Sequence, residues 1–360
     1  MALCLSFGSA AASQSNVKVY VNNVRIDEKT ILSDDRTYIP VRAVSEAMGA
    51  NVMWDAASNS VFITYTEDDT IAKLVSDVSS SVVAIIGNYN GSGEQIKYNN
   101  PTIHGSGVIY KSDGRIITNA HVVKDIKNLT VVLSDGSFLP GRVLYSDEKA
   151  DLAVVKIDKI GLNAISFANK SQIESGRCAI AIGTPISLSM RNTVTKGIVC
   201  SSSVTLESSF YKLIQTDASI NPGNSGGALL NIKGELIGIN SSKFAGNGID
   251  NMAFAIPADT VEYAINEFEK YGKIRRPDFS ITLENSWESK IGLPTSKGIT
   301  VKSSNNPDIK AQDVITAVNG ISVHSIADWN EALKTTYNGT SADVTFVRSG
   351  TEGTVNIKSN

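Results

Sequence analysis

The chain of 360 residues carries a formal net charge of -3 at pH 7, and this near-neutral balance gives no reason to expect a nucleic-acid partner. Apolar residues make up 42% of the sequence and charged residues 19%, as in globular proteins with a buried core, and the length predicts two to three domains of roughly 100–200 residues each. No apolar run approaches the roughly 20 residues needed to cross a bilayer, so we expect no stable insertion into a membrane.

Residues 1–16 differ from the rest of the chain. The stretch Met1–Phe7 is apolar, and Ala10–Ala12 supplies the small residues typical of a signal-peptidase site. The basic segment that usually comes first in such a signal is missing. We interpret residues 1–16 as the remnant of a signal peptide, with a frayed hydrophobic tail as the alternative.

A small α+β domain is predicted over residues 17–65. Alternating residues in Val17–Val21 indicate a strand, helical spacing in Val41–Met48 indicates a helix, and short strands follow at Asn51–Trp54 and Val61–Tyr65. The stretch RTYIPVRAVSEAMGANVMWDAASNSVFIT resembles the stalk domain named after the N-terminus of copper amine oxidase, which is typical of exported proteins of Gram-positive bacteria. The resemblance implies a spacer or adhesion module. Because this part contains no histidine, we predict no copper site in it. We expect no metal site elsewhere in the chain.

A polar linker that runs into a helix is predicted over residues 66–76, before a long β-rich region at 77–271. Short apolar runs alternate here with Gly, Asn, Asp and Ser turns, which is typical of one or two β-barrels. The runs include Val82–Ile86, Gly107–Tyr110, Leu129–Leu133 and Leu236–Ile239. Helical periodicity returns only at Pro257–Tyr271.

Three cysteines are too few for a disulfide framework, and Cys4 would leave with the export signal. Cys178 and Cys200 flank a predicted hairpin formed by Ala179–Gly183 and Thr193–Val199. Antiparallel pairing about the middle of its loop would set the two cysteines opposite each other. Two interpretations stay open, a disulfide or two buried thiols.

Residues 277–360 are predicted to mix short strands with one helix, Ile326–Thr335. The run Asp313–Val318 indicates a strand that ends in an Asn-Gly turn at residues 319–320.

The same segment resembles a PDZ domain. DVITAVNGISVHSIADWNEAL matches the later strands and the groove helix, and RRPDFSI lies where the carboxylate-binding loop would be. The resemblance implies that Phe279, Ser280 and Ile281 contact substrate. Because Ser280 replaces the usual glycine and Asn305–Gln312 shortens a helix, we expect a groove that binds extended peptides without tight capture of a carboxylate. A purely structural cap is the alternative.

Two motifs supply a base and a carboxylate. Thr118–Val123 is a strand that ends on His121, one of three histidines in the chain. Ala150–Ile157 sets Asp151 directly before an apolar strand, where a partly buried carboxylate needs a hydrogen-bond partner such as an imidazole N–H. Taken alone, each residue also has a plainer interpretation, as a structural histidine or as an aspartate at a strand edge.

A third motif, Asn221–Gly227, sets Ser225 within a cluster of glycines. Glycine allows a tight turn that exposes the serine oxygen and directs backbone N–H groups to one point, so we expect those of Gly223 and Ser225 to form an oxyanion hole. A neutral imidazole at His121 would take the serine proton, and Asp151 would orient the ring. The order His, Asp, Ser along the chain is that of chymotrypsin.

Six stretches resemble the HtrA (Deg) family of serine proteases, in family order from about residue 105 to residue 257. They are GSGVIYKSDGRIITNAHVV, ADLAVVKI, AIGTP, TVTKGIV, LIQTDASINPGNSGGALLNIKGELIGIN and AFAIP. The resemblance implies a mainly β fold with a chymotrypsin-like double β-barrel, the catalytic residues His121, Asp151 and Ser225, and no cofactor. It is compatible with a homotrimer. It also implies that the loops Ser201–Tyr211 and Ser241–Met252 order the site when substrate binds.

The specificity pocket is predicted from Ser219, six residues before the nucleophile, where a charged residue would give cleavage after Lys or Arg. Ser219 is neutral and Ile220 is apolar, so we predict a small apolar pocket that prefers Val, Ile, Ala or Leu. Together, the motifs predict a secreted or cell-surface endopeptidase of a Gram-positive bacterium that degrades unfolded or misfolded proteins and peptides. The alternatives are a non-catalytic chaperone or cell-surface scaffold, and an esterase.

Overall fold

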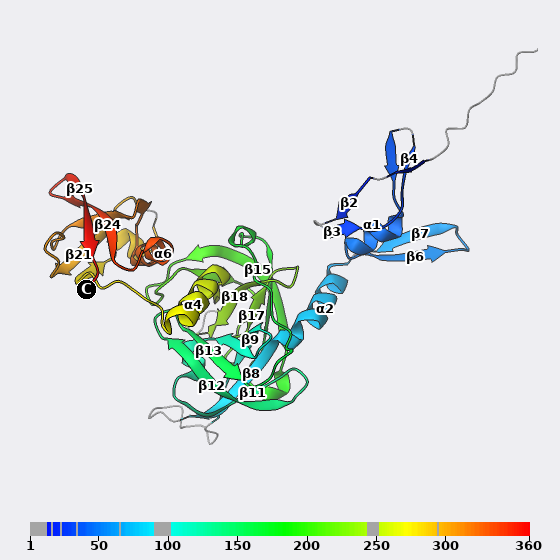
Figure 1. Ribbon diagram of the computed structural model, residues 1–360, viewed down its shortest axis with the longest axis horizontal. Coiled ribbons are helices and arrows are strands. Elements are labelled where there is room, and N and C mark those ends of the chain that lie inside the picture. The colour runs from blue at the N-terminus through cyan, green and yellow to red at the C-terminus, as the bar shows by residue number, and fades with distance from the viewer. Residues whose placement is uncertain are drawn as a thin grey trace, which may run out of the picture. The chain divides into compact units, whose positions relative to one another are not determined.

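The computed structural model divides the chain into two compact units, residues 1–74 and 75–360 (Figure 1). It describes residues 13–15, 17–21, 24–33, 35–64, 66–89, 102–242, 252–293 and 295–360. Most of the expected export signal therefore lies outside the described residues. Helix α2, Glu67–Val78, occupies the predicted linker, and three acidic residues in its first turn favour helix formation there because that end of a helix is electropositive.

The first unit consists of small sheets and one helix. Its elements are β1 (Ser13–Ser15), β2 (Val19–Val21), β3 (Val24–Ile26), β4 (Thr30–Ser33), β5 (Arg36–Tyr38), α1 (Val41–Ala47), β6 (Asn51–Asp55) and β7 (Ser60–Thr64). Separate sheets join β1, β4 and β5, then β2 with β3, and β6 with β7. The predicted helix and the hairpin after it are confirmed, and α1 begins directly after a proline, which suits a helix start because proline lacks a backbone N–H.

The second unit begins with a closed barrel in the strand order β10-β13-β12-β11-β8-β9. Its strands are β8 (Val82–Tyr89), β9 (Thr102–Lys111), β10 (Arg115–Thr118), β11 (Ile126–Val132), β12 (Phe138–Asp147) and β13 (Leu152–Ile157). The barrel is filled by β-branched side chains such as Ile85, Ile109 and Ile116, all with 0% exposure, and this residue type packs well on pleated strands. The short helix α3, Ala120–Val123, follows β10.

A second closed barrel follows, in the order β14-β15-β16-β19-β18-β17. Its strands are β14 (Cys178–Gly183), β15 (Thr193–Val204), β16 (Leu213–Thr216), β17 (Ala228–Leu230), β18 (Leu236–Ser241) and β19 (Ala253–Pro257). Helix α4, Ala258–Tyr271, packs against β18 and β19 and ends at Gly272, whose φ of +73° is accessible to glycine. The two barrels confirm the predicted mainly β fold.

The predicted pairing of the two cysteines is wrong. In the β14–β15 hairpin Cys178 lies opposite Ile198, so Cys200 is displaced by two residues along the strand. No disulfide joins the two cysteines; Cys178 is half-buried and Cys200 is exposed, so two buried thiols are not observed either.

The C-terminal part is a sheet in the order β20-β21-β22-β24-β25, with β23 paired to β22. Its elements are β20 (Ile281–Glu284), α5 (Trp287–Lys290), β21 (Ile299–Ser304), β22 (Val314–Val318), β23 (Ile321–Ser322), α6 (Ile326–Thr336), β24 (Ser341–Arg348) and β25 (Thr351–Lys358). Helix α6 begins at an N-cap, where Ser325 Oγ accepts a hydrogen bond from the N–H of Asp328. The predicted helix and the Asn-Gly turn are both confirmed.

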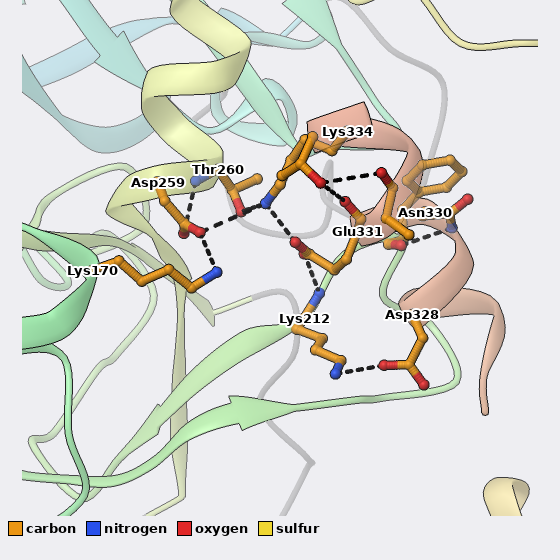
Figure 2. Close-up of polar contacts among 11 residues, drawn as sticks. Lys170, Lys212, Asp259, Thr260, Asp328, Asn330, Glu331 and Lys334 are labelled. Carbon is orange, nitrogen blue, oxygen red and sulfur yellow. Dashed lines mark hydrogen bonds and ion pairs between the residues drawn. The ribbon is translucent and has the colours of Figure 1, made fainter. Parts of the chain in front are cut away.

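Helix α6 contacts the second barrel through polar side chains (Figure 2). Lys334, whose side chain is 3% exposed, lies 2.6 Å from Glu331 and donates to Thr260 Oγ1 at 2.8 Å. Lys212 pairs with Asp328 at 2.5 Å, and its backbone N–H donates to Glu331 at 3.2 Å. These contacts join the helix to α4 and to the loop that precedes β16.

Candidate active site

Strand pairing in the first barrel brings the predicted base and carboxylate together. β10 and β13 are antiparallel with Thr118 opposite Ala153, so the residues just beyond the pair, His121 and Asp151, lie next to each other. Nδ1 of His121 is 2.9 Å from each carboxylate oxygen of Asp151, and the backbone N–H of His121 donates to Oδ1 at 3.1 Å. This geometry suits an imidazole that is protonated on Nδ1 and keeps Nε2 for a second partner.

Asp151 is held from several sides. It is 1% exposed and has a φ of +52°, a left-handed conformation that Asp adopts more readily than most residues. Ser241 Oγ donates to its Oδ2 at 3.2 Å, and Asn119 Nδ2 donates to its backbone oxygen at 3.0 Å. The donors to its carboxylate, Ser241 and His121, offset the loss of water that burial entails.

Ser225 lies in the turn between β16 and β17 and is 3% exposed. Its Oγ accepts a hydrogen bond from the backbone N–H of Ser242 at 2.9 Å and lies 2.6 Å from Ser242 Oγ. Among the residues that the structure describes, no hydrogen bond joins Ser225 to His121. The structure therefore pairs the predicted base with the carboxylate, and directs the predicted nucleophile to Ser242.

The two serines at the end of β18 connect the halves of the site. Ser241 contacts Asp151, and the next residue, Ser242, contacts Ser225. These two neighbouring serines therefore link the His121–Asp151 pair to the predicted nucleophile. Neither serine was predicted to have a role of its own. The only sequence signal is two polar residues after an apolar strand, a pattern that also marks ordinary strand ends.

The remaining histidines have other surroundings. His104, in β9, is half-buried, and burial lowers the pKa of its ring. Its Nε2 has no hydrogen-bond partner among the described residues. His324 precedes α6 in the C-terminal sheet. In the described part of the chain, His121 is the histidine that pairs with a carboxylate.

The glycine-rich turn is fixed by its backbone oxygens. Pro222 O accepts from the N–H of Ile186 at 2.9 Å, Gly223 O accepts from Ser106 Oγ at 2.8 Å, and Ser225 O accepts from the N–H of Ser106 at 2.8 Å. Gly223 has a φ of +102°, and a Cβ there would lie 2.3 Å from a backbone oxygen, so only glycine fits. Neither the N–H of Gly223 nor that of Ser225 donates to an acceptor among the described residues.

The predicted specificity residues differ in exposure. Ser219 is exposed, and its backbone oxygen accepts from Thr195 Oγ1 at 2.9 Å, whereas Ile220 is 8% exposed and belongs to the core of the second barrel. No group of three or more His, Cys, Asp and Glu side chains in the described ranges is arranged to hold a metal ion.

The three predicted peptide-binding residues of the C-terminal sheet have different environments. Phe279 is 4% exposed and packs in the core against Trp329, so its side chain does not reach the surface. Ser280 has a φ of +55°, and its N–H donates to the Asp278 carboxylate at 2.8 Å. Ile281 is half-buried at the start of β20. Ser280 thus adopts the backbone conformation that a glycine would have here, with its N–H already bonded.

Comparison with known proteins finds three family models along the chain. They are a copper amine oxidase N-terminal domain over residues 18–91, a trypsin-like peptidase domain over residues 105–239 and a PDZ domain over residues 281–359. The chain is 36% identical to the serine protease Do-like HtrA of Lactococcus lactis over 310 residues, which cover 78% of this chain and 76% of that protein. The chain belongs to the HtrA family of serine proteases.

Other HtrA proteins agree with this assignment. The serine protease Do-like HtrB of Bacillus subtilis is 35% identical over 324 residues, covering 81% of this chain and 71% of that protein. A solved structure of the HtrA-type protease AlgW with a tripeptide aligns with a TM-score of 0.65 at 29% identity, over 80% of this chain and 95% of the other. As an HtrA protein, the chain has a trypsin-like domain, a C-terminal PDZ domain and an N-terminal domain of the copper amine oxidase type. In the described ranges, none of its helices has both the length and the apolar character of a membrane span.

Proposed function

We propose that this serine protease is an endopeptidase in which Ser225 is the nucleophile, His121 the general base and Asp151 the residue that orients the base. The observation that carries the proposal is the contact of 2.9 Å between His121 Nδ1 and Asp151, in a site that also contains Ser225. The proposal requires that the Ser225 hydroxyl, which contacts Ser242 in this structure, turn to Nε2 of His121.

The reaction proceeds through an acyl-enzyme. Ser225 Oγ bonds to the carbonyl carbon of the peptide while its proton passes to His121 Nε2 and the carbonyl electron pair moves onto oxygen. When the tetrahedral intermediate collapses, the C–N bond breaks and His121 returns the proton to the leaving amine. Water then attacks the ester, and His121 carries its proton to the departing Ser225 oxygen. Asp151 stays ionised and stabilises the imidazolium in both halves.

The oxyanion would be stabilised by the backbone N–H groups of Gly223 and Ser225. Because a trans peptide directs its C=O and N–H to opposite sides, the hydrogen bond from Ile186 to Pro222 O turns the N–H of Gly223 away from the 185–187 loop. Both N–H groups lack an acceptor among the described residues, as expected of donors reserved for a reaction intermediate.

Substrate selection is proposed to depend on two regions. The exposed, neutral Ser219 beside the apolar Ile220 supports cleavage after small apolar residues such as Val, Ala, Ile or Leu. In the PDZ domain, a cavity of about 340 Å³ lies between β20, the start of α6 and residues 205–209 of the protease domain, and would receive an extended peptide by strand addition. The proposed substrates are unfolded or misfolded proteins, met at the cell surface of a Gram-positive bacterium. The proposed assembly is a homotrimer.

The test compares the full chain with its Ser225→Ala variant on casein as an unfolded substrate. We expect degradation by the wild type only, with fragments that end after small apolar residues. Fragments that end mainly after Lys or Arg would contradict the proposed pocket. Absence of degradation, with suppressed aggregation by both proteins, would instead support a chaperone.

A further inference from the structure

Ile186, in the loop between β14 and β15, has a strained backbone. Its φ is +59°, and it is the central residue of a three-residue turn in which the N–H of Ser187 donates to Pro185 O at 2.5 Å. Turns of this kind with a positive central φ are rare, and a β-branched residue is among the least suited to them. A strained residue persists only where its surroundings hold it.

Packing of the Ile186 side chain does not explain the strain. The residue is 66% exposed, so burial of the side chain contributes little. Glycine or asparagine would adopt the same φ more easily. What the conformation does achieve is a backbone contact, because it places the N–H of Ile186 2.9 Å from Pro222 O.

This contact acts on the proposed oxyanion hole. Pro222 O belongs to the peptide whose other end is the N–H of Gly223, and the peptide is planar, so holding the oxygen fixes the direction of the N–H. If Ile186 relaxed to a negative φ, its N–H would leave Pro222 O. The peptide could then rotate and aim its carbonyl oxygen at the site of the developing negative charge, where it would oppose catalysis.

A second connection joins the loop after β14 to the glycine-rich turn, and it is made by a buried side chain. Ser106 Oγ accepts from the N–H of Thr184 at 2.9 Å and donates to Gly223 O at 2.8 Å. Ser106 is 0% exposed, in a strand of the first barrel. Ser106 therefore fixes the far side of Gly223, and the exposed, strained Ile186 is the weaker of the two supports.

We propose that Ile186 is a positioning residue for the oxyanion hole, and that the strain of its turn limits the fraction of molecules in which the hole is formed. The proposal rests on the assignment of Gly223 and Ser225 as oxyanion donors. It predicts that backbone preference at position 186, and not the isoleucine side chain, sets the turnover rate.

The test is a series of three variants of the full chain, assayed for kcat and KM on a peptide substrate and for the rate of Ser225 labelling by a fluorophosphonate. Ile186→Gly relieves the strain and should raise kcat about three- to tenfold with KM little changed. Ile186→Ala removes the side chain but keeps a Cβ, so its kcat should lie between those of the wild type and the Gly variant. Ile186→Pro forbids a positive φ and removes the N–H, and should lower kcat by about tenfold or more.

Thermal unfolding of each variant shows whether it is folded before its kinetics are compared. Equal kcat for the Ala and Gly variants would assign the effect to the side chain and overturn the proposal. A folded Pro variant as active as the wild type would overturn it as well. Failure of the catalytic assignment is distinguishable, since Ser225→Ala would then keep its activity and its labelling.

Discussion

Among single residues, Asp151 is the one whose environment leaves least freedom. It is buried, left-handed in its backbone, and accepts hydrogen bonds from His121 and Ser241. Both carboxylate oxygens accept hydrogen bonds here. An asparagine in place of Asp151 would direct its NH2 group at a group that itself donates, and one of these hydrogen bonds would be lost.

In the variant Asp151→Asn, kcat should therefore fall about 10⁴-fold while KM stays nearly unchanged. The imidazole would adopt the wrong tautomer, but the peptide would still bind. The matched control is Asp158→Asn, just beyond the other end of β13, whose side chain is 79% exposed. That control should leave kcat unchanged. Steady-state kinetics on a peptide checks both, and a loss below about tenfold for Asp151→Asn would contradict the role of Asp151.

The sequence predicts some of these residue environments and not others. Asp151 before an apolar strand, and His121 after one, predict a carboxylate beside an imidazole, because both positions follow from strand alternation. The left-handed Ile186 runs against local preference, since isoleucine favours extended backbone. Its conformation depends on Pro222, thirty-six residues later in the chain, and no local pattern encodes that contact.

Among the elements, the carboxyl end of β18 has the largest effect on the site, because its last residue contacts Asp151 and the following one contacts Ser225. The hydroxyl of Ser242, 2.6 Å from Ser225 Oγ, competes with His121 for the nucleophile. If Ser225 donates to Ser242, its proton points away from the base. If Ser242 donates, it occupies a lone pair of the nucleophile.

Ser242→Ala should therefore increase the rate at which a fluorophosphonate labels Ser225, by roughly two- to tenfold, as expected for loss of one hydrogen bond with a net strength of about 0.5–1.5 kcal/mol. Ser242→Thr keeps the hydroxyl and should label like the wild type. Ser241→Ala removes a donor to Asp151 instead, and should label more slowly. Equal rates for the Ala and Thr variants at position 242 would show that the hydroxyl does not restrain the nucleophile.

In the β14–β15 hairpin the two strands could be predicted from the sequence, but the loop and the register could not. Both strands were predicted from their apolar runs, but the loop between them contains the short 3-10 helix Leu188–Met190, which no local signal placed. Moving the centre of a hairpin by one residue shifts every pairing by two. Cys178 therefore faces Ile198, and the register could not be read from the strands alone.

At the scale of the whole molecule, the order of the three domains was predictable because each carries its own local motifs. The contacts between α6 and the protease domain were not, since they join polar residues that lie far apart in the chain and belong to separate domains. Lys334 is the clearest case, because its position on a predicted helix gave no sign that its side chain would be 3% exposed.

Lys334→Ala should weaken the contact of the PDZ domain with the protease domain. The change leaves the buried Thr260 hydroxyl without its donor and removes the cation that lies 3.9 Å from Asp259. We therefore expect the contact to lose about 1–3 kcal/mol and the PDZ domain to unfold in a separate, earlier transition. Lys170→Ala is the matched control, because Lys170 bonds Asp259 in the same cluster but its side chain is 72% exposed (Figure 2). It should cost at most about 1 kcal/mol. Differential scanning calorimetry distinguishes the two outcomes.

Acid should have the same effect on the wild type. Burial acts to raise the pKa of Asp259, but Lys334 and Lys170 outweigh it, so the pKa lies below its ordinary value of 3.8. A carboxylate with a lowered pKa stabilises the folded state above that ordinary value, and its contribution is lost as the pH falls through the lower one. The separate PDZ transition should therefore appear in the wild type only as the pH falls below about 3.8. A single transition that persists until Asp259 is fully protonated would show that this cluster does not hold the domains together.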